Sequence, residues 1–194
     1  WRAALESVTG PLDPFDAHTH LGDNDPDEFS QTVQQLLQGL GAADARATTF
    51  ASAEPDGYGP ANDRIIADAK ASDGVLVPYA RLDPAADPVA EAERCLAAGA
   101  KGIKLHPWLQ GFPCLGGPAL HTLCEVCEAA SAPILLHDGT SNVSLPAQAA
   151  LLARQHPRMT FLLGHAGLQH LWREAGEAAC RCPNVHLILC GPPL

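Results

Sequence analysis

The stretch Phe15-Asp16-Ala17-His18-Thr19-His20-Leu21-Gly22 decides the fold, because it places two histidines at the end of an apolar run. Successive side chains of an extended strand point to opposite faces, so His18, His20 and Asp16 share one side. Two imidazoles in this H-x-H arrangement can bind one cation from a single strand end. The motif is weak by itself, and its meaning depends on what the other strands supply.

Six further apolar runs follow the first, with helical stretches between them. Continuous apolar runs are typical of parallel strands that are buried on both faces. The runs recur at intervals of about 30 residues, the size of a β-α unit. Together with the first, they span 14–18, 47–53, 74–81, 102–106, 133–137, 160–165 and 185–190.

The stretches between the runs carry helix signals. Apolar residues recur at helical spacing over 29–40, and Gly41 suits the position just after a helix. Asp87 followed by Pro88 is typical of an N-cap and a first helical residue, and that helix is predicted to end at Gly99. Helices are also predicted for 118–130 and 146–155, and a loop for 111–117.

Seven strand–helix alternations in a chain of 194 residues are compatible with two architectures. A doubly wound sheet is disfavoured because no G-x-G-x-x-G follows the first run. In a (β/α)8 barrel, functional side chains converge at the C-terminal strand ends. Histidines close the fourth, fifth and sixth runs at His106, His137 and His165. We therefore predict one TIM-barrel domain over 1–194, with seven β-α units present and the eighth strand missing.

The composition argues against several classes of partner. Charged residues make up 18% of the chain, and acidic ones prevail, giving a formal net charge of −10. Such a charge repels nucleic-acid phosphates and anionic lipids, so we expect neither as a partner. No apolar run approaches the roughly 20 residues of a spanning helix, and no signal-peptide pattern opens the chain. We expect a cytoplasmic protein with a small-molecule substrate, and we leave homo-oligomer formation open.

The seven cysteines are predicted to be reduced, and several of them buried. Cys124 and Cys127 form a C-x-x-C spacing, and Cys180 and Cys182 a C-x-C. Both pairs fall in helix-like stretches rather than in zinc-ribbon turns. Packing is therefore favoured over a four-thiolate zinc site.

Four motifs resemble the amidohydrolase superfamily, more narrowly its small barrel enzymes related to aminocarboxymuconate semialdehyde decarboxylase. The resemblance implies one divalent metal ion, commonly zinc, held by His18, His20 and His137. It also implies that His165 hydrogen-bonds the metal-bound water or the substrate and acts in acid–base catalysis. Neutral imidazoles suit zinc, and three protein ligands leave a position for water. The motifs span nearly the whole chain, at 15–22, 102–107 (GIKLHP), 136–137 (LH) and 164–167 (GHAG).

Members of this superfamily usually contribute a further aspartate from the eighth strand. No aspartate follows Asp138 in this sequence, and the chain stops just after the seventh run. We therefore expect a C-terminally truncated barrel that binds metal weakly and turns over little by itself. Asp138 directly follows His137, and strand alternation predicts that it points away from the metal.

Further side chains are candidates for substrate contact. Arg81 could hold a substrate carboxylate through its bidentate fork, or form a salt bridge with Asp83 or Asp87. His106 is expected on the substrate side. Lys104 shares a face with His106, and we expect a buried lysine paired with a carboxylate. The alternative, a carboxylated lysine between two metal ions as in binuclear members, is disfavoured.

The aromatic residues after the fourth run have two interpretations. Trp108 and Phe112 lie in a segment that contains glycine and proline, where aromatic side chains can form a pocket wall. Packing of this segment against the barrel is the favoured role for both.

Three functional hypotheses remain. The leading one is hydrolysis of a small organic amide, lactone or ester by metal-activated water. The second is non-oxidative decarboxylation of an aromatic or muconate-like carboxylic acid, with His165 helping to protonate the carbanion-like centre. The third is an inactive fragment or binding module. The motifs do not separate the first two, since both chemistries use the same ligand set.

Overall fold

Seven parallel strands form one curled sheet, in which each strand pairs with the next one along the chain. The structure is a computed structural model that describes residues 2–26, 28–115, 117–140 and 142–190. The strands are β1 (Phe15–Leu21), β2 (Arg46–Ala51), β3 (Leu76–Arg81), β4 (Gly102–Leu105), β5 (Ile134–Leu136), β6 (Phe161–Leu163) and β7 (Val185–Leu187).

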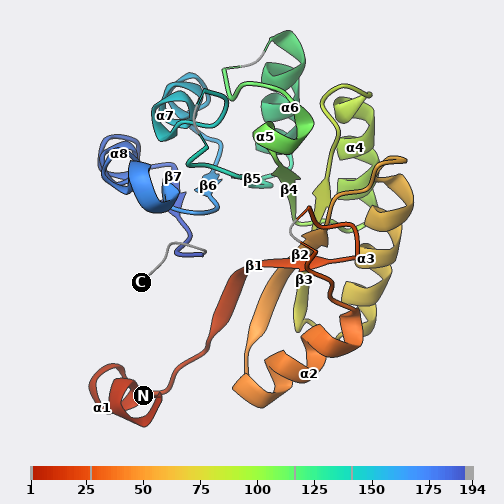
Figure 1. Ribbon diagram of the computed structural model, residues 1–194, viewed down its shortest axis with the longest axis vertical. Coiled ribbons are helices and arrows are strands. Elements are labelled where there is room, and N and C mark those ends of the chain that lie inside the picture. Colours follow the sequence, from red (N-terminus) through yellow and green to blue (C-terminus); the bar gives the residue numbers. More distant parts are fainter. Residues whose placement is uncertain (1, 27, 116, 141, 191–194) are drawn as a thin grey trace.

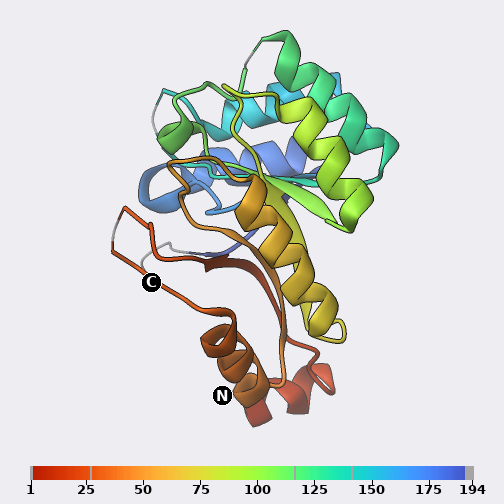
Figure 2. The same cartoon turned by 90° about the vertical axis from the view of Figure 1, so that its right-hand side faces the viewer.

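Helices connect the strands and cover the outer face of the curled sheet (Figures 1 and 2). Within the described part of the chain, no pairing joins β7 back to β1, so the barrel is open between these two strands. This confirms the predicted TIM-type barrel with seven strands and without a complete eighth unit. The helices are α1 (Arg2–Thr9), α2 (Val33–Ala43), α3 (Gly59–Ala71), α4 (Pro88–Ala98), α5 (Pro107–Gln110), α6 (Pro118–Ala129), α7 (Pro146–Gln155) and α8 (Leu168–Arg181).

The core lies on both faces of the sheet, as continuous apolar strands require. The largest cluster joins the strands to α4, α6, α7 and α8, and every residue of β5 is buried. A smaller cluster of Phe50, Tyr79 and Leu135 lies on the inner face. Phe50 packs edge-on against the rings of His18 and His20, so this inner core supports the histidines directly.

The predicted helix over 29–40 is displaced along the chain. Thr32 caps α2 and forms a capping box with Gln35, so the helix begins at Val33 and Phe29 remains outside it. The helix continues to Ala43 and ends at Asp44, which adopts a left-handed conformation with φ 50°. The apolar periodicity predicted the helix correctly, but the capping residues set its ends.

The other predicted helix boundaries are close to those observed. Asp87 accepts a hydrogen bond from the backbone N–H of Ala90, and Gly99 ends α4 with φ 123°. Both α6 and α7 begin at the predicted prolines, where the missing N–H costs no helical hydrogen bond. Residue 116 of the predicted loop over 111–117 lies outside the described residues.

The cysteines are free thiols, as predicted. Cys124, Cys127 and Cys182 are buried in the largest core cluster, whereas Cys180 is exposed. Packing therefore explains most of the C-x-x-C and C-x-C spacing. None of the described helices is both long and apolar enough to cross a membrane.

Candidate metal centre

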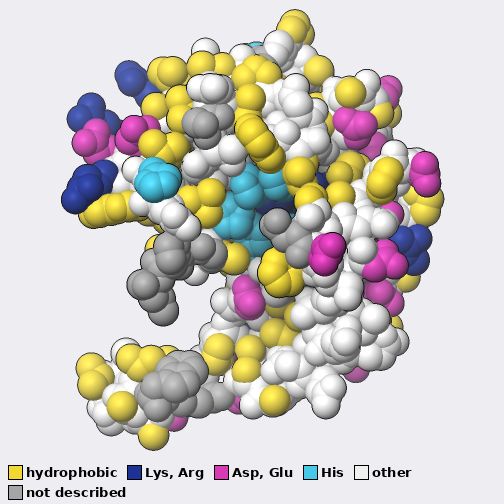
Figure 3. Space-filling view, viewed as in Figure 1, with side chains coloured by type: hydrophobic (Ala, Val, Ile, Leu, Met, Phe, Trp, Pro, Cys, Tyr) yellow, Lys and Arg dark blue, Asp and Glu magenta, His cyan; other side chains and the backbone are white. Residues whose placement is uncertain are grey.

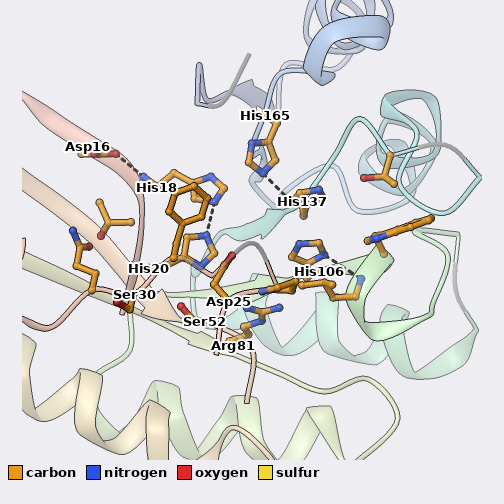
Figure 4. A pocket seen from close by; sticks show the side chains of 17 residues that line it. Asp16, His18, His20, Asp25, Ser30, Ser52, Arg81, His106, His137 and His165 are labelled. Carbon is orange, nitrogen blue, oxygen red and sulfur yellow. Dashed lines mark hydrogen bonds between the residues drawn. The ribbon is translucent and has the colours of Figure 1, made fainter. Parts of the chain in front are cut away.

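A cavity of about 700 Å³ opens at the C-terminal ends of the strands. Figure 3 shows a hollow with histidine side chains at its base, and Figure 4 shows their rings turned toward one another. The structure thus brings together all five of the strand-end histidines singled out from the sequence: His18, His20, His106, His137 and His165.

The rings of His18 and His20 converge at their Nε2 atoms, which lie 3.2 Å apart. His18 Nδ1 lies 2.9 Å from the carbonyl oxygen of Gly164, which can only accept a hydrogen bond. The proton of His18 is therefore on Nδ1, and its Nε2 carries a lone pair. Nδ1 of His20 is buried without a hydrogen-bond partner. His18 Nε2 thus offers a lone pair, and the neighbouring ring of His20 has an unsatisfied nitrogen. A cation bound between the two rings would complete this arrangement.

A second chain of imidazoles runs from β6 to β4. His165 Nδ1 donates to the carbonyl oxygen of Cys190 at 3.0 Å, so its Nε2 accepts a hydrogen bond from His137 Nδ1 at 2.9 Å. The Nε2 atom of His137 is then left with a lone pair. The His106 ring stacks on the His137 ring, with centroids 3.8 Å apart. His106 Nδ1 accepts from the backbone N–H of Leu109, which leaves its Nε2 as a donor.

Burial keeps these imidazoles neutral. It lowers the pKa of His20 to about 3 and that of His106 to about 2, and in both cases the charge of Lys104 adds to the effect. The pKa of His165 falls to about 4 for the same two reasons. Burial also lowers the pKa values of the remaining two rings, His18 and His137. Neutral rings at pH 7 are the form that binds metal.

Asp138 positions His165 through hydrogen bonds between its carboxylate and the backbone that follows β6. It is 1% exposed, and its two oxygens accept the backbone N–H groups of His165 at 2.7 Å and Gly167 at 2.6 Å. The loop that follows His165 adopts positive φ at three successive residues, 47° at Ala166, 84° at Gly167 and 51° at Leu168. The carboxylate thus holds a backbone turn that non-glycine residues rarely adopt. As predicted, Asp138 does not line the histidine cavity.

Arg81 lies at the wall of the cavity and is 1% exposed. Its Nη1 donates to the carbonyl oxygen of Ala51 at 3.1 Å, whereas Nε and Nη2 are buried without a partner. Asn62 accepts the backbone N–H of Arg81 and donates to its carbonyl oxygen. Of the two alternatives considered, the salt bridge with Asp83 or Asp87 is not formed, and these carboxylates instead accept backbone N–H groups of their own local turns.

Lys104 differs from its prediction. It is fully buried, its Nζ has no hydrogen-bond partner among the described residues, and it lies 5.0 Å from the centroid of the Phe50 ring. Burial lowers the pKa of this amine well below its usual range, which relieves the need for a paired carboxylate. The predicted carboxylate pairing is therefore wrong. The apolar surroundings favour the neutral amine, which needs no counter-ion.

The aromatic residues after β4 divide between the two roles considered. Trp108 is 58% exposed and lines the cavity, so its predicted packing role is wrong. Phe112 packs against the largest core cluster, as predicted. The short helix α5, which follows β4 directly, turns Trp108 toward the cavity mouth. Further residues that no sequence motif indicated also line the cavity: Asp25, Phe29, Ser30, Gln31, Ser52 and Thr140.

A group of donor atoms suited to a metal ion lies within this cluster. One ring nitrogen of His18, one of His165 and the sulfur of Cys190 lie within 4.8 Å of one another. This group shares only His18 with the predicted ligands and adds His165 and Cys190, and among the described residues no such group joins His18, His20 and His137. The sequence did contain a signal for Cys190. It is the last residue of the seventh apolar run, just as histidines are the last residues of the fourth, fifth and sixth runs. Neutral imidazoles and a thiol are donors that suit a divalent transition metal.

A curled parallel sheet with imidazoles gathered at the C-terminal strand ends defines a barrel enzyme fold whose site suits a divalent metal. Residues 15–193 match a family model described as Amidohydrolase, so the chain belongs to the amidohydrolase family. A comparison with curated proteins gave no match.

Solved structures share this fold at low sequence identity. A 4-oxalomesaconate hydratase from Rhodopseudomonas palustris is 16% identical with a TM-score of 0.67, covering 92% of this chain and 74% of its own. A structure described as a probable 2-pyrone-4,6-dicarboxylic acid hydrolase, from Acinetobacter baumannii, is 14% identical with a TM-score of 0.61, covering 86% and 66%. A 2,6-dihydroxybenzoate decarboxylase is 15% identical with a TM-score of 0.55, covering 79% and 66%. The chain thus spans about two thirds to three quarters of these proteins.

Proposed function

We propose that this chain carries the metal site of a hydrolase that uses metal-activated water on a small organic amide, lactone or ester. The observation that carries the proposal is the convergence of five strand-end histidines in one cavity. His18, His20 and His137 would hold one divalent ion, zinc by preference for nitrogen donors. Bound there, the ion would lower the pKa of a coordinated water toward about 7 and polarise a carbonyl group.

The remaining side chains have roles that follow from their hydrogen bonds. His165 Nε2 is the acceptor of its ring, since Nδ1 donates to the carbonyl oxygen of Cys190, and it would take up a proton in the cavity once its hydrogen bond from His137 is released. His106 offers a donor at Nε2, directed by its bond from Leu109, and can orient a substrate oxygen. Trp108 and Phe29 provide apolar surface for the rest of a small molecule.

A second candidate function is decarboxylation of an aromatic or muconate-like acid, and Arg81 favours it. The unpartnered Nε and Nη2 groups of this buried guanidinium lie at the cavity wall. Unsatisfied buried donors are costly, and a carboxylate would satisfy both in one bidentate contact. The same contact would also anchor a carboxylated lactone or ester, so Arg81 supports an acidic substrate in either reaction.

Metal content tests the proposed site. With a divalent metal supplied in excess, we expect the protein to bind about one ion per chain, and His18→Ala and His137→Ala to lose most of it. His170→Ala, on the exposed side of α8, is the matched control and should retain it. If both site variants kept the full metal content by elemental analysis, the ligand assignment would be wrong.

The reaction itself is tested by the products. Acidic lactones, esters and amides should be hydrolysed by the metal-loaded protein, with incorporation of oxygen from labelled water. Aromatic acids tested under the same conditions would instead release carbon dioxide if decarboxylation is the reaction. We place the activity in the cytoplasm, with a small molecule rather than nucleic acid or a membrane as the partner.

A further inference from the structure

Cys190 lies at the histidine cluster although no other cysteine does. All seven cysteines are described, and five of them are buried while Cys180 is exposed on α8. Only Cys190 belongs to a group of donor atoms among the described residues. It follows β7 at the C-terminal edge of the sheet, three residues after Leu187, whereas the histidines follow β4, β5 and β6 by one or two residues. Its place in the fold is therefore that of a site residue.

Hydrogen bonds hold this cysteine beside the metal-binding rings. His165 Nδ1 donates to the carbonyl oxygen of Cys190 at 3.0 Å, which ties the chain after β7 to the end of β6. The backbone N–H of Cys190 donates to Ile188 at 3.0 Å, which turns the chain after the strand. His18 is fixed in turn by Gly164, the neighbour of His165. One hydrogen-bond network thus holds the backbone of Cys190 beside the imidazoles.

The chemistry of the group distinguishes it from an ordinary buried cysteine. The Nδ1 protons of His18 and His165 are both committed to carbonyl oxygens, so Nε2 is the acceptor on each ring, with His20 at 3.2 Å from one and His137 at 2.9 Å from the other. One ring nitrogen of each histidine and the sulfur of Cys190 lie within 4.8 Å of one another, so one ion could reach all three. A small inward movement of the donors would bring them to bonding distance of about 2.0 to 2.3 Å.

We propose that Cys190 supplies a thiolate ligand to the ion bound by His18, so that the centre is a mixed imidazole–thiolate site. This inference rests on the metal centre of the proposed function. On binding, the thiol proton is released to solvent and the sulfur–metal bond replaces the S–H bond. A thiolate favours zinc and cobalt over magnesium and manganese, whereas a site of imidazoles and carboxylates accepts all of them more evenly.

Cobalt absorption tests this ligand independently of activity. Metal-free protein titrated with Co²⁺ should develop a thiolate-to-cobalt charge-transfer band in the near ultraviolet, together with the visible bands of a tetrahedral ion. Cys190→Ser should lose the charge-transfer band, and Cys180→Ser, which changes the exposed cysteine of α8, should retain it. Cys190→Asp should restore cobalt binding without restoring the band, because a carboxylate is a ligand without sulfur.

The outcomes separate the two proposals. A stoichiometric cobalt complex without the charge-transfer band, or a band that persists in Cys190→Ser, would overturn the thiolate ligand while leaving the metal centre in place. Failure of the native chain to bind cobalt or zinc at all would overturn both. If the variants do not fold, alkylation of the native chain decides the point. Bound zinc should slow the labelling of Cys190 and leave that of Cys180 unchanged, and equal labelling of Cys190 with and without zinc would refute the proposal.

Discussion

The carboxylate of Asp138 accepts the backbone N–H of His165 at 2.7 Å, and so joins the end of β5 to the end of β6. Asp138→Ala would leave two buried N–H groups, those of His165 and Gly167, without acceptors. Each such group costs about 1–3 kcal/mol, so we expect a loss of about 2–6 kcal/mol in the free energy of unfolding. Urea denaturation followed by circular dichroism measures this loss.

Two further variants calibrate the effect of Asp138. Asp138→Asn keeps one oxygen acceptor and should lie between the native chain and the alanine variant. Asp13→Ala removes an exposed ion pair with Arg46 and should cost less than about 1 kcal/mol. If Asp138→Ala were no less stable than Asp13→Ala, the hydrogen bonds that Asp138 accepts from His165 and Gly167 would not contribute to the free energy of unfolding.

Arg81 should determine the affinity for acidic ligands. We expect Arg81→Leu to weaken the binding of a carboxylate probe such as benzoate by about 10- to 100-fold, because charge-assisted hydrogen bonds contribute about 1.5–3 kcal/mol. Calorimetry on metal-free protein isolates this contact from the metal. Benzamide, which has the same ring without the charge, should bind the native chain and Arg81→Leu alike.

A matched variant guards against a general loss of structure. Arg158→Leu removes an exposed guanidinium that pairs with Glu128, and since neither residue lines the cavity it should leave benzoate binding unchanged. Arg81→Lys keeps the charge but not the planar fork, and should recover only part of the affinity. Equal affinity of Arg81→Leu and the native chain for benzoate would exclude the arginine as the anchor.

Much of the fold was predictable because its signals are local. Apolar runs and helix-capping residues act over a few positions, and both the strands and the helices from Pro88, Pro118 and Pro146 were predicted from them. The joint placement of His18, His106, His137 and His165 also followed from strand order alone, since parallel strands align their C-terminal ends.

The rest depended on contacts between distant segments. The partner of Arg81 could not be read from nearby carboxylates, because Asp83 and Asp87 cap their own turns and Asn62 from α3 holds the arginine backbone instead. Lys104 lacks a carboxylate because Phe50 from β2 fills the space over its amine. Neither arrangement has a signal in the spacing of the sequence.

The buried imidazoles predict a loss of stability in mild acid. Below about pH 6.5 the unfolded chain takes up protons at its histidines, whereas burial keeps the folded rings neutral until pH 4 or lower. Each such histidine should therefore remove up to about 1.4 kcal/mol per pH unit as the pH falls through this window. The raised pKa of Asp138 acts in the opposite direction, but it is one group against five.

Urea midpoints of metal-free protein at about pH 7.5, 6 and 5 test this dependence. The free energy of unfolding should be highest at the first pH and fall steadily toward the last. His165→Gln removes one of the buried rings and should reduce the slope. A slope that is the same for His165→Gln and the native chain would show that this ring takes up its proton in the folded state as readily as in the unfolded one.

Gly164 provides the most local test of the metal centre. A Cβ atom at this position would lie 2.9 Å from the carbonyl oxygen of Leu136 and 3.0 Å from Cε1 of His18, both closer than ordinary contact. Gly164→Ala should therefore displace the His18 ring, cost about 1–3 kcal/mol of stability and weaken zinc binding by about 10- to 100-fold.

Gly176→Ala on α8 meets nothing within 4 Å and should stabilise the chain by about 0.5–1 kcal/mol without changing zinc affinity. The two glycine variants make the same chemical change, so any difference in zinc affinity measures the fit around His18. Equal zinc affinities would mean that the His18 ring is not held in place by its packing against β6.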